Sequence, residues 1–148
     1  MNSQQLDQKV RQHVYEVALA TGTPPAISVV TEALGIARDQ AEASLQRLAG
    51  AHVLVLQPEG REILMAAPFS AVPTPFLVRT PKYSCFGNCI WDALGVAAML
   101  QMDVWIDTSC QDCGTLMSLA VRSGAVSHDG LVHFAIPARE WWADIVFT

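Results

Sequence analysis

Positive charge is scarce in this sequence. Nine Lys and Arg residues stand against 14 Asp and Glu, which gives a net charge of −5. This balance argues against a broad electrostatic attraction to nucleic acid or to an anionic membrane surface. Charged residues make up only 16% of the chain and hydrophobic residues 51%, a composition that excludes disorder and requires a buried core. The 148 residues suffice for one good-sized domain or two small ones.

Long apolar runs are also missing. The longest, such as LGVAAMLQM, are far shorter than the ~20 residues that cross a bilayer. The first ten residues, MNSQQLDQKV, lack the basic start and the apolar stretch of a secretory signal. We therefore expect a cytoplasmic protein that makes no membrane contact. Thiols stay reduced in the cytoplasm, which favours metal binding or catalysis over disulfides for the four cysteines, Cys85, Cys89, Cys110 and Cys113.

Residues 1–68 are predicted to form a compact, winged-helix-like helical module. Apolar residues recur at helical spacing from Leu6 to Val17, and the glycine and prolines of TGTPP end this first helix. ISVVTEALG predicts a second helix, and QAEASLQRLAG a third with Asp39 as its N-cap and Gly50 at its end. HVLVL and EILMA, separated by QPEG, predict a β-hairpin. Three helices followed by a hairpin is the order of a winged helix.

The predicted third helix offers little for DNA recognition. It carries Arg47, with Arg38 just before it, and residues 1–60 hold four basic and six acidic side chains. A protein that recognises duplex DNA normally makes several phosphate contacts through Lys or Arg. Nucleic acid is therefore disfavoured as a partner, and a packing or dimerising role for this module is favoured. A homodimer is left open.

The pattern changes in the second half of the chain. Residues 69–82 are rich in proline and predict a connector, and residues 83–148 predict a core with a small sheet and a helix. That helix is NCIWDALGVAAMLQ, with Asn88 as its N-cap. VWIDTSC, LMSLAVRSG and LVHFAIP predict three strands, and REWWAD a helical turn. The fold class is therefore α+β. The apolar ending, IVFT, leads us to expect that the domain continues past Thr148.

The predicted helix brings a thiol and a carboxyl group together. Cys89 and Asp92 are three positions apart and so lie on one helix face. The partial positive charge at a helix start favours the thiolate, so we expect Cys89 to be nucleophilic. Apolar neighbours should raise the pKa of Asp92 and let it hold a proton near neutral pH. Such a pair suits a soft electrophile that carries a leaving group in need of a proton. Because sulfur is a soft ligand, it suits soft metals in particular.

These residues resemble a known family. FGNCIWDALGVAAML resembles the first active-site segment of the organomercurial (alkylmercury) lyases, in which aspartate follows cysteine by three residues. The resemblance continues through DTSCQDCG and LMSLAV to HFAIPAREWWADIVFT, and the N-terminal helices suit the winged-helix-like module that precedes this family's catalytic core. Only the segment around Cys89 and Asp92 is specific. By the resemblance, Cys110 occupies the position of a further cysteine with a mainly structural role.

The resemblance implies cleavage of a carbon–mercury bond by protonolysis, with a small organomercurial as substrate. Cys89 would bind mercury as a thiolate, and Asp92 would handle the proton that is delivered to the departing carbon. A hydrocarbon and Hg(II) would result, with the mercuric ion held at Cys89 and Asp92, and no organic cofactor is needed. In the family a second cysteine completes the metal site, shortly after a segment like WWADIVF. We expect that cysteine to follow in a longer natural protein, or Thr148 to stand near its place with weakened activity.

Two alternatives remain at the level of sequence. Cys85 and Cys89, together with Cys110 and Cys113, form two close pairs of thiols, the general format of a structural zinc site. In such a site Cys89 would be a zinc ligand and could not act as a catalytic thiolate. The second alternative is a metal-responsive winged-helix regulator without catalysis, which the few basic residues of the N-terminal module disfavour.

Overall fold

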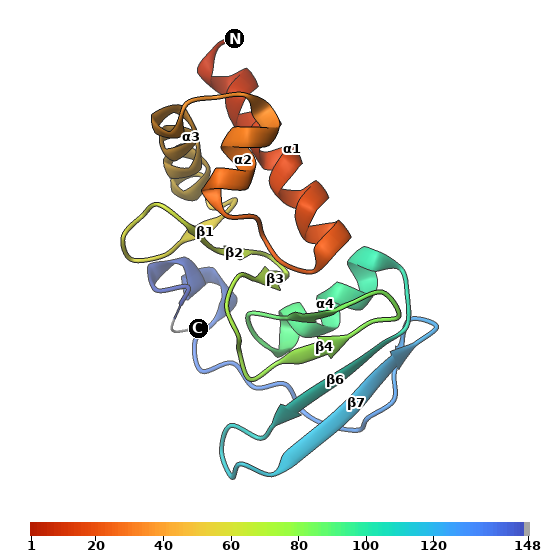
Figure 1. The fold of residues 1–148 in the computed structure, drawn as a ribbon. Helices are drawn as coiled ribbons and strands as arrows, with labels where there is room; N and C mark the ends of the chain where they lie inside the picture. The colour runs from red at the N-terminus through yellow and green to blue at the C-terminus, as the bar shows by residue number, and fades with distance from the viewer. Residues whose placement is uncertain (147–148) are drawn as a thin grey trace.

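The computed structural model of the protein describes residues 1–146. Within them, three helices and a three-stranded sheet form one group, and a fourth helix on a five-stranded sheet forms a second (Figure 1). Each group encloses its own cluster of buried apolar side chains. The predicted α+β class is confirmed. The comparison with a winged helix stays a prediction.

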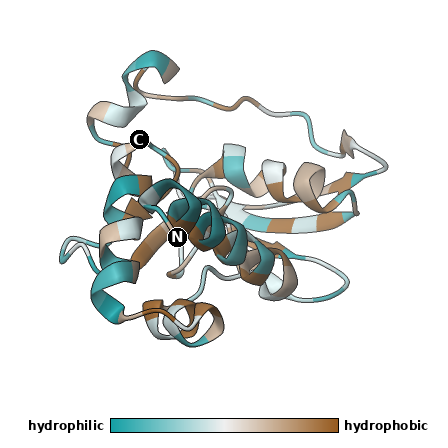
Figure 2. Cartoon of the chain, turned by 90° about the horizontal axis from the view of Figure 1, so that it is seen from above, coloured by the Kyte–Doolittle hydropathy of each residue, from teal (hydrophilic) through white to brown (hydrophobic). Residues whose placement is uncertain are grey.

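The N-terminal helices begin and end largely where their capping residues require. Helix α1 (Ser3–Thr21) starts with a capping box between Asn2 and Gln5, and Gly22 ends it in the left-handed conformation. Helices α2 (Ile27–Leu34) and α3 (Arg38–Gly50) follow. The N-cap of α3 is Ala37, so the prediction of Asp39 is wrong by two positions. The helices carry both hydrophilic and hydrophobic residues (Figure 2), and over residues 1–146 none is long and apolar enough to cross a membrane.

The predicted hairpin is present and gains a third strand. Strands β1 (Val55–Leu56), β2 (Ile63–Ala66) and β3 (Phe69–Ser70) pair antiparallel in that order. Fully buried Phe69 belongs to the core of the second group, and it forms an isolated bridge with Gly87. The small sheet therefore ties the two groups together.

The second group is an antiparallel sheet covered by a helix. Its strands are β4 (Leu77–Arg79), β5 (Ser84–Phe86), β6 (Val104–Ser109), β7 (Leu116–Arg122) and β8 (Ala125–Val126), in the order β5-β4-β6-β7-β8. Helix α4 (Ile90–Leu100) buries Ala93, Val96 and Ala97 in the apolar cluster that it shares with β4 and β6. The proline-rich segment 69–82 contributes β3 and β4, so part of it lies inside the sheets. The division of the chain into domains stays a prediction.

One predicted strand is absent. LVHFAIP, residues 131–137, forms no ladder, and Leu131 is fully exposed. The edge of β7 is already paired, because a tight turn at Ser123 and Gly124 brings β8 back against it. The chain instead runs from the sheet toward β1 and β2, where Ala138–Ala143 forms the 3-10 helix η1 (Figure 1). The helical turn predicted for REWWAD is confirmed.

Candidate active site

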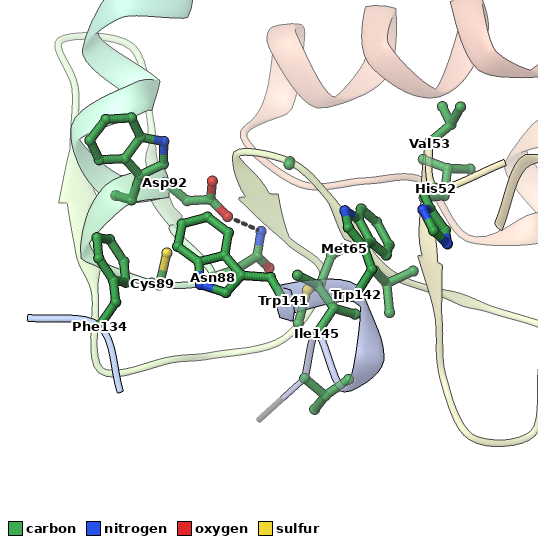
Figure 3. Close-up of a pocket in the computed structure, with 15 residues that line it drawn as sticks. His52, Val53, Met65, Asn88, Cys89, Asp92, Phe134, Trp141, Trp142 and Ile145 are labelled. Carbon is green, nitrogen blue, oxygen red and sulfur yellow. Dashed lines mark hydrogen bonds between the residues drawn. The ribbon is translucent and has the colours of Figure 1, made fainter. Parts of the chain in front are cut away.

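A cavity of about 280 Å³ lies between the two groups. Its lining comes from four stretches that are distant in the sequence, namely residues 52–55, 65–67, 88–92 and 134–146. Most of the lining is apolar or aromatic. The polar side chains are few, and three of them, Asn88, Cys89 and Asp92, gather at the start of α4 (Figure 3).

Helix α4 places the predicted pair in this cavity. Cys89 is the N-cap residue and Asp92 lies in the first turn. The sulfur of Cys89 and the carboxyl group of Asp92 both face the space beside Trp141 (Figure 3). The structure therefore brings together the two residues that the sequence selected as catalytic. Both are partly buried, so water has only limited access to them.

Burial dominates the proton affinity of both groups. It raises the pKa of the Cys89 thiol, and the nearby Asp92 carboxylate adds to the rise, although the backbone N–H groups of Asp92 and Trp91 act in the opposite direction. The helix start was expected to lower the pKa of this thiol, but burial outweighs that effect. The prediction of a lowered pKa is therefore wrong. Burial also raises the pKa of Asp92, as predicted, and the hydrogen bond from Asn88 partly offsets it.

Asn88 is a contributor to the site that the sequence did not single out. It was predicted as the N-cap of α4, but Cys89 holds that position. The amide nitrogen of Asn88 instead donates to a carboxylate oxygen of Asp92 at 2.8 Å. The amide oxygen of Asn88 is buried and has no hydrogen-bond partner among residues 1–146. The spacing of four residues between an asparagine and an aspartate at a helix start is the signal that could have identified this contact.

The C-terminal segment lines one side of the cavity with aromatic rings. The ring of Phe134 packs edge-to-face against Trp91, with ring centroids 6.4 Å apart. It also packs against Trp141, with ring centroids 4.9 Å apart. Trp142 stacks on the ring of His52 from the N-terminal group, with centroids 4.2 Å apart and planes within 3° (Figure 3). The sequence showed that the EWWAD segment is aromatic, but nothing in it linked this segment to His52. Thr148, a candidate for the place of the family's second cysteine, lies outside the described residues.

The other three cysteines lie elsewhere. Cys85 is on β5, 2% exposed, and burial raises its pKa to about 11. Cys110 and Cys113 are in the turn between β6 and β7. Among residues 1–146, no three Cys, His, Asp or Glu side chains are grouped so that they could hold a metal ion. The structure therefore gives no support to a four-thiol zinc site, because the two predicted pairs do not meet.

The protein is thus a small α+β protein that holds a thiol and a carboxyl group in one largely apolar cavity. The family model for MerB, alkylmercury lyase, matches residues 69–148. The chain belongs to the alkylmercury lyase family. Among solved structures, the mercury-bound form of MerB2 matches with a TM-score of 0.55 and 23% sequence identity, over 70% of this chain and 50% of that one. The chain thus spans about half the length of this relative. No curated protein matches it.

Proposed function

We propose that this protein cleaves the carbon–mercury bond of small organomercurial compounds. The observation that carries the proposal is the shared placement of the Cys89 sulfur and the Asp92 carboxyl group in one apolar cavity. Membership of the alkylmercury lyase family supports the same chemistry. Mercury is the substrate's own metal, and thiolate sulfur is the protein ligand that soft metals prefer.

The raised pKa of both groups suits a reaction that needs one proton. The Cys89 thiol binds the organomercury cation, a sulfur–mercury bond forms, and the thiol proton passes to the carboxylate of Asp92. Asp92 then gives this proton to the carbon atom, and the carbon–mercury bond breaks as its electron pair forms the new carbon–hydrogen bond. The products are a hydrocarbon and Hg(II), which the Cys89 thiolate and the Asp92 carboxylate hold. A carboxyl group with a raised pKa is a suitable general acid for the second step.

The cavity walls suit the organic part of such a substrate. A dry apolar cavity of about 150 Å³ holds a benzene ring. The cavity here, at about 280 Å³, has room for an aryl group and the mercury atom. Trp91, Phe134 and Trp141 offer ring faces and edges to the organic group.

The test is direct. Protein is incubated with a phenylmercury salt and an excess of free thiol, and the released benzene is measured by gas chromatography. Cys89→Ser should reduce release to background, and Asp92→Asn should slow it by about 100-fold or more, the usual size of a general acid–base contribution.

A matched control separates the role of Asp92 from a loss of helix stability. Asp39 is the acidic residue in the first turn of α3, as Asp92 is in the first turn of α4. Asp39 does not line the cavity, so Asp39→Asn makes the same chemical change outside it and should leave benzene release unchanged. Unchanged release in both Cys89→Ser and Asp92→Asn would refute the proposal. An absence of release from the wild-type chain would reject catalysis.

A further inference from the structure

A second pair of thiols lies in the turn between β6 and β7, outside the cavity. The backbone of this turn is held by two hydrogen bonds. The N–H of Gly114 donates to the carbonyl of Cys110 at 2.8 Å, and the N–H of Cys110 donates to the carbonyl of Thr115 at 2.8 Å. Residues 111–115 are all exposed. The turn therefore fixes the backbones of Cys110 and Cys113 close to one another at an accessible end of the hairpin.

The side chain of Cys113 is held in a polar setting. Its sulfur lies 3.1 Å from the hydroxyl oxygen of Thr115. Hydrogen bonds from the Thr115 hydroxyl and then from the Thr115 N–H lower the pKa of Cys113, and the neighbouring Cys110 thiol acts in the same direction. The thiolate is the form of cysteine that binds metals. Both sulfurs are free, with no disulfide between them.

The composition of the turn restricts the metal that it can hold. Structural zinc sites use four ligands in a tetrahedron. No third Cys, His, Asp or Glu side chain joins this pair within the described part of the chain. Two sulfurs without further ligands suit a soft, closed-shell cation that binds two thiolates in a line, of which the mercuric ion is an example.

We propose that Cys110 and Cys113 form a second site, which chelates a soft two-coordinate cation such as Hg(II) at the β6–β7 turn. The site uses no atom of the cavity and does not depend on catalysis at Cys89. Formation of each sulfur–mercury bond releases the proton of that thiol, if it is still bound, to water. Two thiols on one turn act as a chelate. Once the first thiol has bound the cation, the second binds it within the same molecule, and this raises the affinity by about 100-fold or more.

The experiment uses the full chain carrying Cys89→Ser, so that the cavity thiol is absent. The protein is reduced, desalted without air and given mercuric chloride. Excess glutathione, which displaces mercury held by a single thiol, is then added. Mercury that stays with the protein after gel filtration is measured by mass spectrometry. About one ion per chain should remain. Adding Cys113→Ser should lower the glutathione concentration that strips the metal by about 100-fold.

Two controls keep the result interpretable. Cys113 is exposed and serine can keep the hydrogen bond to Thr115, so circular dichroism should report an unchanged fold. Asp112→Asn changes the same turn without removing sulfur and should retain the metal. Buried Cys85 is present in every variant and contributes equally to all of them. Retention that Cys113→Ser does not reduce, or no retention by the Cys89→Ser chain, would overturn the site. Benzene release from the unsubstituted chain tests the cavity separately.

Discussion

The close approach of Gly87 to helix α4 gives the sharpest prediction of stability. Gly87 lies just before the Asn88–Cys89 corner, and its N–H donates to the carbonyl of Phe76 at 3.0 Å. A Cβ atom at position 87 would lie 2.6 Å from the backbone nitrogen of Ala93 and 2.8 Å from its Cα. These are backbone atoms of a packed helix and cannot rotate aside. Gly87→Ala must therefore displace either α4 or the loop that precedes it.

The expected cost follows from other overpacked cores. Forcing one extra carbon into a packed interior costs about 1–3 kcal/mol. A loss of about 2 kcal/mol lowers Tm by roughly 4–8 °C in a chain of this size. The displacement would also move Cys89 relative to Asp92. We therefore expect benzene release to fall even at temperatures where the Gly87→Ala chain stays folded.

A second glycine in the same helix supplies the control. At Gly95 a Cβ atom would meet only the Cβ of Pro68, at an ordinary 3.7 Å. Alanine is favoured over glycine inside a helix by about 1 kcal/mol, so Gly95→Ala should raise Tm. Thermal unfolding followed by circular dichroism measures both variants. A Gly87→Ala chain as stable as the wild type would refute the close approach, and with it the described position of α4.

Other contacts give further expectations. Arg47 lowers the pKa of Asp7 through a hydrogen bond, so this carboxylate stabilises the fold above about pH 4 and loses that effect as the pH falls through its lowered pKa. Asp7→Asn should therefore lower the urea midpoint at pH 6 but much less at pH 2.5, and an equal loss at both would contradict the ion pair. Tyr83→Phe removes a 2.8 Å hydrogen bond from the tyrosine hydroxyl to a carbonyl of α1. It should lower the free energy of unfolding in urea by about 0.5–1.5 kcal/mol, and an unchanged free energy would show that water replaces this bond. Trp142→Ala removes the ring stack on His52, which contributes about 0.5–1.5 kcal/mol. Amide hydrogen exchange should become faster in residues 138–146 but not in β6, and unchanged exchange would argue against the stack.

The sequence was most informative where local signals agree. The helical spacing from Leu6 and the glycine at position 22 together predict α1, and the structure ends this helix at Thr21. The same agreement holds for α4, where the three-residue spacing also places Cys89 and Asp92 in one cavity. These features depend on residues that are close in the chain, and so the pattern of a short segment is enough to predict them.

Features that depend on distant residues could not be predicted. LVHFAIP has the composition of a strand. It does not pair with β7, because β8 already occupies that edge. The helix start does act on Cys89 in the expected direction, yet burial by segments up to Val146 reverses the outcome. The stack of His52 on Trp142 joins residues 90 positions apart, and no local pattern announces it.

The composite lining of the cavity has a practical consequence. The family match begins at residue 69, so the Cys89 thiol and the Asp92 carboxyl group are encoded in one half of the chain. His52 and Met65, which form the opposite wall, are encoded in the other half. A fragment that begins at residue 69 would keep both of these groups and lose that wall of the cavity. Cys89 and Asp92 would then be more exposed to water, and their raised proton affinity would shift toward that of free side chains.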